Sequence, residues 1–179
     1  MLKVYDNKLH DSEIKLSDQE QRFYDFLNGA AIGVISSTDP NGDPHGAVIY
    51  YSIDKNFVIE FLTKSHTKKY DNITRNNHIM LTVFDALTQT TVQVTGLAKE
   101  IKNDSVLQKL VKQVFEKSLR TSEAGQHPLS KLDAGNYVGF KIEPVQIRMA
   151  VYARPDPGEY SEIFETIDSF EQGSLEINR

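Results

Sequence analysis

Alternation of apolar and polar residues over short segments is the feature that most constrains how this chain can fold. In residues 90–101, TTVQVTGLAKEI, valines alternate with polar residues at every second position. In residues 78–85, HIMLTVFD, three aliphatic residues alternate with their neighbours in the same way. Because successive side chains of a strand point to opposite faces, each segment predicts a strand with one buried face.

Further segments complete the predicted sheet. Strands are expected over residues 31–38, 46–53, 57–63 and 138–151, separated in part by turns at residues 39–43 (DPNGD) and 54–56 (DKN). The third of these places Phe57, Ile59 and Phe61 on one face. The last carries two apolar series, Val138, Phe140 and Ile142 and then Val145, Ile147, Met149 and Val151. Pro144 between them predicts a bulge or bend. Six or seven short strands with few helices predict a mainly β protein built as a small antiparallel barrel.

Two segments have helical periodicity instead. Residues 18–28 follow Ser17, and Glu20 stands three positions after Ser17, the pattern of a capping box. Residues 104–119 carry an apolar stripe at helical spacing. The length of 179 residues favours a single domain over 1–179, with a barrel core at about 18–153. Residues 154–179 contain seven acidic residues and are expected to form a C-terminal extension.

Composition excludes several classes of function. The net charge of -5 argues against general nucleic-acid binding. The chain has no cysteine, so disulfides and thiol nucleophiles are excluded, and its five histidines show no metal-ligand spacing. The N-terminus lacks the apolar run of a signal peptide, and no apolar stretch is long enough to cross a membrane. We therefore expect a cytoplasmic protein with no metal site.

One turn carries an unusual concentration of positive charge. Lys64, Lys68 and Lys69 stand where the third strand is expected to pass into a helix. Cations near a helix N-terminus oppose its dipole by about 0.3–1 kcal/mol each. Lys64 and Lys68 would also be like charges one helical turn apart, unfavourable by roughly 0.2–0.5 kcal/mol. A bound phosphate would reverse the sign of both effects. The alternative is that these lysines are ordinary solvated surface residues.

The order of motifs around this turn resembles the flavin-binding core of the pyridoxamine 5'-phosphate oxidase-like split-barrel family, over roughly residues 20–150. The matching motifs are Gly42, Asp43 and Pro44 in a hairpin, Phe61, Leu62 and Thr63 at a strand end, Thr67, Lys68 and Lys69 in the turn, Asn76 and Asn77 at the helix end, and the strand at 90–101. This resemblance implies a six- to seven-stranded antiparallel split β-barrel that binds FMN.

The resemblance also assigns residues to the cofactor. It implies that Thr67, Lys68 and Lys69 bind the terminal phosphate of FMN. The segment lining the isoalloxazine would comprise Ala47, Val48, Ile49 and Tyr50, with Leu62, Thr63 and Thr91 from other strands. Members of the family are typically homodimers with the flavin at the interface, and the strand at 46–53, apolar on both faces, suits that arrangement.

The chain departs from pyridoxamine 5'-phosphate oxidases proper at its C-terminal end. It has no tryptophan, and neither Arg154 nor Arg179 has a neighbouring histidine to form their Arg-x-His motif. We therefore expect an FMN-dependent oxidoreductase acting on a small molecule other than pyridoxamine 5'-phosphate, and the sequence identifies no catalytic acid or base. The alternatives are a non-catalytic flavin-binding or stress-response protein, or a relative that binds coenzyme F420 or haem.

Overall fold

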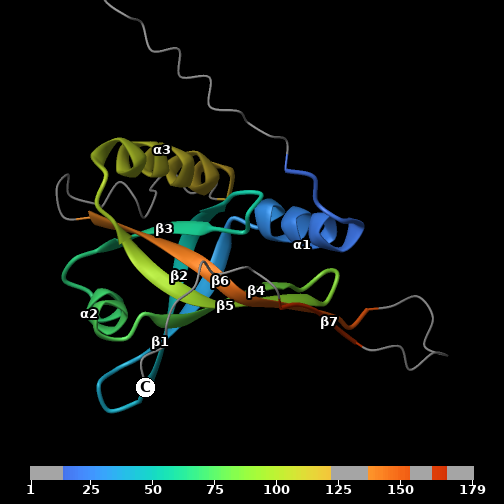
Figure 1. Ribbon diagram of the computed structural model, residues 1–179, viewed down its shortest axis with the longest axis horizontal. Helices are drawn as coiled ribbons and strands as arrows, with labels where there is room; N and C mark the ends of the chain where they lie inside the picture. The colour runs from blue at the N-terminus through green and yellow to red at the C-terminus, as the bar shows by residue number, and fades with distance from the viewer. Residues whose placement is uncertain (1–13, 122–136, 154–162, 169–179) are drawn as a thin grey trace, which may run out of the picture.

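The computed structural model describes residues 14–121, 137–153 and 163–168. Its elements lie in the order α1 (Asp18–Gly29), β1 (Ile32–Thr38), β2 (Pro44–Ile53), β3 (Ile59–Lys64), α2 (Lys68–Arg75), β4 (His78–Asp85), β5 (Thr90–Ile101), α3 (Asp104–Thr121), β6 (Tyr137–Val151) and β7 (Phe164–Ile167). In Figure 1, α3 lies above the strands, and α2 and β7 lie at opposite ends of the molecule.

The strands form one antiparallel sheet that closes on itself. Its order is β3-β2-β1-β4-β5-β6-β7, and β3 also pairs with β6, so six strands form a closed barrel and β7 is added outside it. The closure joins Ile59 to Ile142 and Lys64 to Tyr137. The predicted split β-barrel with six to seven antiparallel strands is therefore confirmed.

Side-chain alternation fills the barrel as the sequence predicts. Every second residue of β4 and β5 points inward, so Leu81, Val92 and Val94 are fully buried. Phe61 and Phe140 stack across the β3–β6 closure with ring centroids 5.6 Å apart. Phe57, predicted within the third strand, instead adopts a left-handed φ of 61° in the turn before β3, although its side chain is still buried.

The bulge predicted near Pro144 lies one residue later, at Val145. Pro144 pairs with Gly96 and Gln146 pairs with Thr95, so Val145 is the extra residue on β6. The sequence placed Val145 in the second apolar series, but its side chain is 40% exposed because it occupies the bulge. Gly96 allows this close approach, since a Cβ there would lie 2.5 Å from the carbonyl oxygen of Glu143.

The helices cover parts of the barrel. The capping box of α1 is present, and α1 is tied to β2 by the Tyr51 hydroxyl, which donates a 2.6 Å hydrogen bond to the Leu27 carbonyl oxygen. Leu110 and Val114 of α3 are buried against Leu62. No helix among the described residues is long and apolar enough to span a membrane.

The expected C-terminal extension falls only partly within the described residues. Its described part, residues 163–168, contains β7, which pairs with the second half of β6 from Ile147 to Ala150. The remainder, 154–162 and 169–179, lies outside the described residues. The proposed division into core and extension stays a prediction.

Candidate functional site

The lysine-rich turn passes from β3 into α2 at Thr67. The helix begins at Lys68, and the Thr67 side chain caps it by accepting a hydrogen bond from the Tyr70 backbone N–H. Lys64 is therefore the last residue of β3 and not part of the helix. The expected repulsion between Lys64 and Lys68 one helical turn apart does not arise, because only Lys68 is helical.

The Thr67 hydroxyl is already fully engaged in holding this turn. It donates to the Lys64 carbonyl oxygen at 2.9 Å and accepts from the Tyr70 N–H at 3.3 Å. The Thr63 hydroxyl lies 3.1 Å away. Because a hydroxyl has one proton, Thr63 must be the donor in this last pair. Thr63 and Thr67 thus shape the turn, and a ligand there would meet the backbone N–H groups of Lys68 and Lys69, which have no partner among the described residues.

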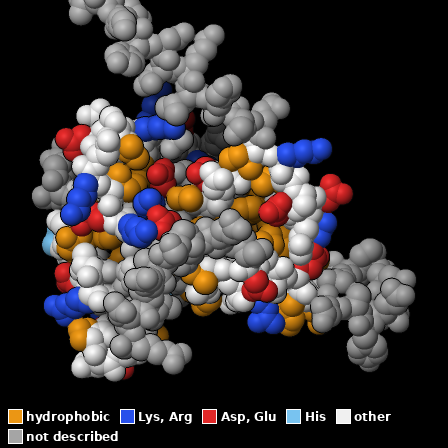
Figure 2. Space-filling view, in the orientation of Figure 1, with side chains coloured by type: hydrophobic (Ala, Val, Ile, Leu, Met, Phe, Trp, Pro, Cys, Tyr) orange, Lys and Arg blue, Asp and Glu red, His pale blue; other side chains and the backbone are white. Residues whose placement is uncertain are grey.

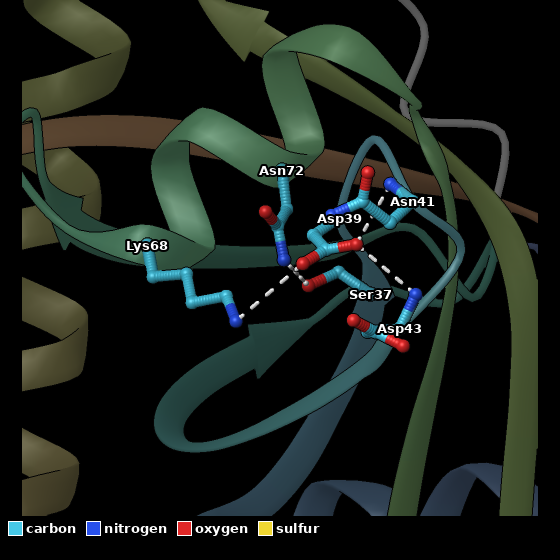
Figure 3. Close-up of polar contacts among 6 residues, drawn as sticks. All are labelled: Ser37, Asp39, Asn41, Asp43, Lys68 and Asn72. Atoms are coloured by element: carbon cyan, nitrogen blue, oxygen red, sulfur yellow. Dashed lines mark hydrogen bonds and ion pairs between the residues drawn. The ribbon is translucent and has the colours of Figure 1, made fainter.

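Lys68 extends from α2 towards the β1–β2 hairpin (Figure 3). Its ammonium lies 3.8 Å from a carboxylate oxygen of Asp39. Partial burial raises the pKa of Asp39, but hydrogen bonds from the backbone N–H groups of Asp43 and Asn41, together with the Lys68 charge, outweigh this and lower it. The Lys68 side chain is 56% exposed, so the ion pair itself contributes little.

The same face of α2 is anchored to β1 by two amide side chains. Asn72 donates to the Ser37 hydroxyl at 3.2 Å, and Asn76 donates to the Thr38 hydroxyl at 3.0 Å. Together with Lys68 they are spaced four residues apart on one side of α2. Their partners are three consecutive residues, Ser37 and Thr38 at the end of β1 and Asp39 in the turn after it. The buried Asn72 contact fixes the helix, so the N-terminal end of α2 is held in place beside the hairpin.

Lys69 turns in the other direction, towards the barrel. Its ammonium lies 5.9 Å from the centre of the buried Phe61 ring. Burial lowers the pKa of Lys69, and no carboxylate among the described residues pairs with it. A partly buried cation without an anionic partner costs free energy in the protein alone, and such groups concentrate at binding sites.

The predicted flavin-lining residues of β2 divide between the two sides of the sheet. Ala47 and Ile49 face the barrel interior, whereas Val48 faces outward and is 65% exposed. Tyr50 also faces outward but packs near α3, beside Leu62. Thr63 is buried on the inner side. The side chains of Val48, Tyr50 and Leu62 therefore lie on the outer face of the sheet. Those of Ala47, Ile49 and Thr63 lie on the inner face.

The outer face of the central strands is apolar and exposed. Val34 of β1 lies directly opposite Val48 of β2 and Thr82 of β4. The exposed apolar residues on this face, called the outer apolar face below, are Ile32, Val34, Val48 and Phe84. A contiguous exposed apolar surface of this kind is typical of an interaction site.

Thr91 lies apart from the other predicted residues. It is on the outer side of β5, opposite Phe84, and strands β4 and β1 lie between β5 and β2. Within one chain the structure thus brings Thr67, Lys68, Lys69, Thr63 and Leu62 together at the β3–α2 turn. Thr91 belongs to another part of the same outer surface.

Sequence reasoning missed two features of these surfaces. Asp39 was interpreted only as a turn residue, since nothing local marks it as a partner of Lys68. The Arg148 side chain is exposed and packs on the Phe164 ring, a contact between distant segments that local sequence does not reveal. Figure 2 shows acidic, basic and apolar side chains interspersed over one face of the molecule rather than a field of one sign.

The fold has relatives among solved structures. A protein of Listeria innocua assigned as a pyridoxamine 5'-phosphate oxidase shares 20% identity over 74% of this chain and 98% of its own, with a TM-score of 0.57. A haem-binding protein of Mycobacterium smegmatis shares 11% identity over 87% of this chain and 60% of its own, with a TM-score of 0.61. An F420 reductase shares 18% identity over 69% of this chain and 94% of its own, with a TM-score of 0.56. At these identities the likeness concerns the fold.

Sequence comparison identifies the family more directly. No curated protein matches the chain. The family model described as pyridoxamine 5'-phosphate oxidase matches residues 19–150, which is well over half of the chain and includes the complete β1–β5 region and the barrel closure. The chain belongs to the pyridoxamine 5'-phosphate oxidase family.

Proposed function

We propose that this protein binds FMN at the β3–α2 turn and acts as an FMN-dependent oxidoreductase on a small molecule. The observation that carries the proposal is Lys69, a partly buried ammonium at a helix N-terminus without a carboxylate partner among the described residues. An anion placed there restores the missing partner and complements the helix dipole as well.

The residues at the turn fit the phosphate end of FMN. Two backbone N–H groups, from Lys68 and Lys69, and the Lys69 ammonium are available around the start of α2. The exposed Lys68 ammonium would join them by leaving Asp39. Charge-assisted hydrogen bonds to a phosphate are the strongest that such groups form. Asn72 and Asn76 hold the helix against β1, so the backbone donors are fixed before a ligand arrives.

The outer surface beside the turn fits the ring end of the cofactor. Leu62, next to the turn on β3, and Tyr50 on β2 face outward but pack against α3, so Val48 is the exposed outward-facing residue of this group. A flavin is a flat, largely apolar ring on an anionic tail, so an apolar strand next to a cationic turn suits both parts. When bound, the flavin supplies the electron transfer, and the protein orients it and admits substrate.

The functional unit in this proposal is a homodimer formed through the outer apolar face. Ile32, Val34, Val48 and Phe84 expose apolar area that a second copy would remove from water. Thr91 is separated from β2 by two strands in its own chain. If Thr91 contacts flavin, as the family resemblance implies, a symmetric partner is the simplest way to bring it there.

The test compares FMN with riboflavin, which lacks the phosphate. Purified protein should bind FMN more tightly than riboflavin, and replacing both Lys68 and Lys69 with alanine should remove most of that difference. Equal losses for the two ligands would show that the lysines do not bind phosphate. Bleaching of bound flavin by NAD(P)H supports the oxidoreductase; flavin without turnover indicates a binding protein. A haem absorption spectrum would show that the cofactor is haem and not FMN. Tighter binding of F420 than of FMN would show that the cofactor is F420.

A further inference from the structure

A second candidate site lies at the other end of the molecule, between β6 and β7. A surface pocket of about 350 Å³ is lined by Gln146, Arg148, Phe164 and Thr166. It is distinct from the lysine turn, because α2 and β7 lie at opposite ends in Figure 1.

Arg148 is held in this pocket by an aromatic ring. Its guanidinium carbon lies 3.8 Å from the centre of the Phe164 ring, so the cation packs against the face of the ring. Arg148 pairs with Thr166 across the strands, and Phe164 is the next residue of β7 on the same side. Packing on a ring engages the face of a guanidinium and leaves its N–H edge free to donate.

Of the two nearby carboxylates, one is directed away from the pocket and the other, on the pocket side, is held by Gln146. Glu165 alternates to the other side of β7 and forms an ion pair with Arg22 of α1. Asp168 accepts a 2.7 Å hydrogen bond from the Gln146 amide. No carboxylate pairs with Arg148 among the residues that the structure describes. Arg148 thus packs on an apolar ring next to the Thr166 hydroxyl, and its guanidinium N–H donors have no acceptor among the described residues.

We propose that this pocket binds the carboxylate of a small molecule with an aromatic or apolar body. The planar fork of Arg148 matches a carboxylate with two parallel hydrogen bonds, and the partly exposed Phe164 ring supplies apolar contact. Arg148 also lies opposite Gln93, two residues from Thr91 on the outer side of β5. The binding site stands independently of the flavin, whereas its role as the anionic subsite for the substrate rests on the proposed function.

The experiment titrates isotope-labelled protein, without flavin, with sodium benzoate and with benzamide, its neutral analogue. NMR shifts of the Arg148 side-chain Nε–H and the Thr166 amide report occupancy. Benzoate should bind at least tenfold more tightly than benzamide, and Arg148→Gln should abolish that preference. Phe164→Leu should weaken benzoate about two- to fivefold by removing the ring contact. Arg22→Gln is the matched control, because Arg22 contacts the same strand from the opposite side.

Each outcome decides the proposal. Equal binding of benzoate and benzamide, or an unchanged preference in a folded Arg148→Gln protein, overturns it. Arg148→Lys retains the charge but lacks the planar fork, so full benzoate affinity in that variant would also contradict the assignment. If phenyl phosphate binds more than tenfold more tightly than benzoate, the proposed ligand class is wrong and the pocket is a phosphate site. A separate FMN titration distinguishes failure of this site from failure of the flavin proposal.

Discussion

Replacing Lys69 with methionine should change stability and FMN affinity in opposite directions. Methionine keeps an unbranched apolar stem against Phe61 and removes the ammonium that burial disfavours. The protein without ligand then no longer holds a partly buried, unpaired charge. With ligand, it lacks a cation that the phosphate would use.

The two effects have different expected sizes. Removing the unpaired charge should stabilise the ligand-free protein by about 1 kcal/mol, which raises Tm by roughly 2–4 °C for a chain of this size. Losing one charge-assisted hydrogen bond of about 1.5–3 kcal/mol should weaken FMN by roughly 10- to 150-fold. Riboflavin should bind the variant as it binds the unaltered protein.

The stability difference should also depend on pH. Burial lowers the pKa of Lys69 in the folded state from its ordinary value of 10.5. Below the folded pKa the lysine is charged in both states, so its destabilising effect is fully present there. As pH rises from the folded pKa towards 10.5, the folded protein loses the proton first and the effect disappears. Urea unfolding of both proteins between neutral pH and pH 10 measures this.

Lys68→Met is the matched control. Lys68 is mostly exposed and pairs with Asp39, so its replacement should leave stability nearly unchanged and still weaken FMN. The reasoning about Lys69 is refuted if Lys69→Met lowers the stability of the ligand-free protein. It is refuted equally if FMN and riboflavin lose the same affinity.

Four further predictions concern the fold, the assembly and the substrate. Gly96→Ala should cost about 2 kcal/mol or more in thermal unfolding because its Cβ would meet the Glu143 carbonyl oxygen at 2.5 Å, whereas Gly46→Ala, 3.5 Å from Val34, should be tolerated. Tyr51→Phe should cost about 1–2 kcal/mol in urea unfolding, because the Leu27 carbonyl loses its donor. Val48→Asp should convert a dimer into monomers by light scattering, while Leu87→Asp, on the 93% exposed turn residue, should not. FMN-loaded protein should release no peroxide from pyridoxamine 5'-phosphate; turnover near 1 per second would contradict this.

The parts of the fold that follow from local alternation were predictable. The bounds of β4 and β5 are those expected from residues 78–85 and 90–101, because each segment ends where turn residues interrupt the alternation. The capping box located the start of α1 for a similarly local reason.

Features that depend on distant parts of the chain were not predictable in this way. The pairing of β3 with β6 and the contact between Lys68 and Asp39 join segments with no shared local pattern. The start of α2 is set by the Thr67 side chain, which accepts a hydrogen bond from the Tyr70 N–H. The lysine turn was recognised from sequence, but the burial of Lys69 required the Phe61 ring beneath it.

The extra residue at Val145 changes the parity of β6. Before it, even-numbered side chains such as Phe140 and Ile142 enter the barrel; after it, odd-numbered ones such as Ile147 do so. Without that offset, Arg148 would project into the apolar interior. One extra residue thus lets the first half of β6 bury its even-numbered side chains in the barrel, while the second half keeps the even-numbered Arg148 in solvent. Deleting Val145 would leave the alternation of inner and outer side chains unbroken from Phe140 to Met149, with the same side chains inside. A relative without the extra residue would therefore carry one continuous alternating series along this strand.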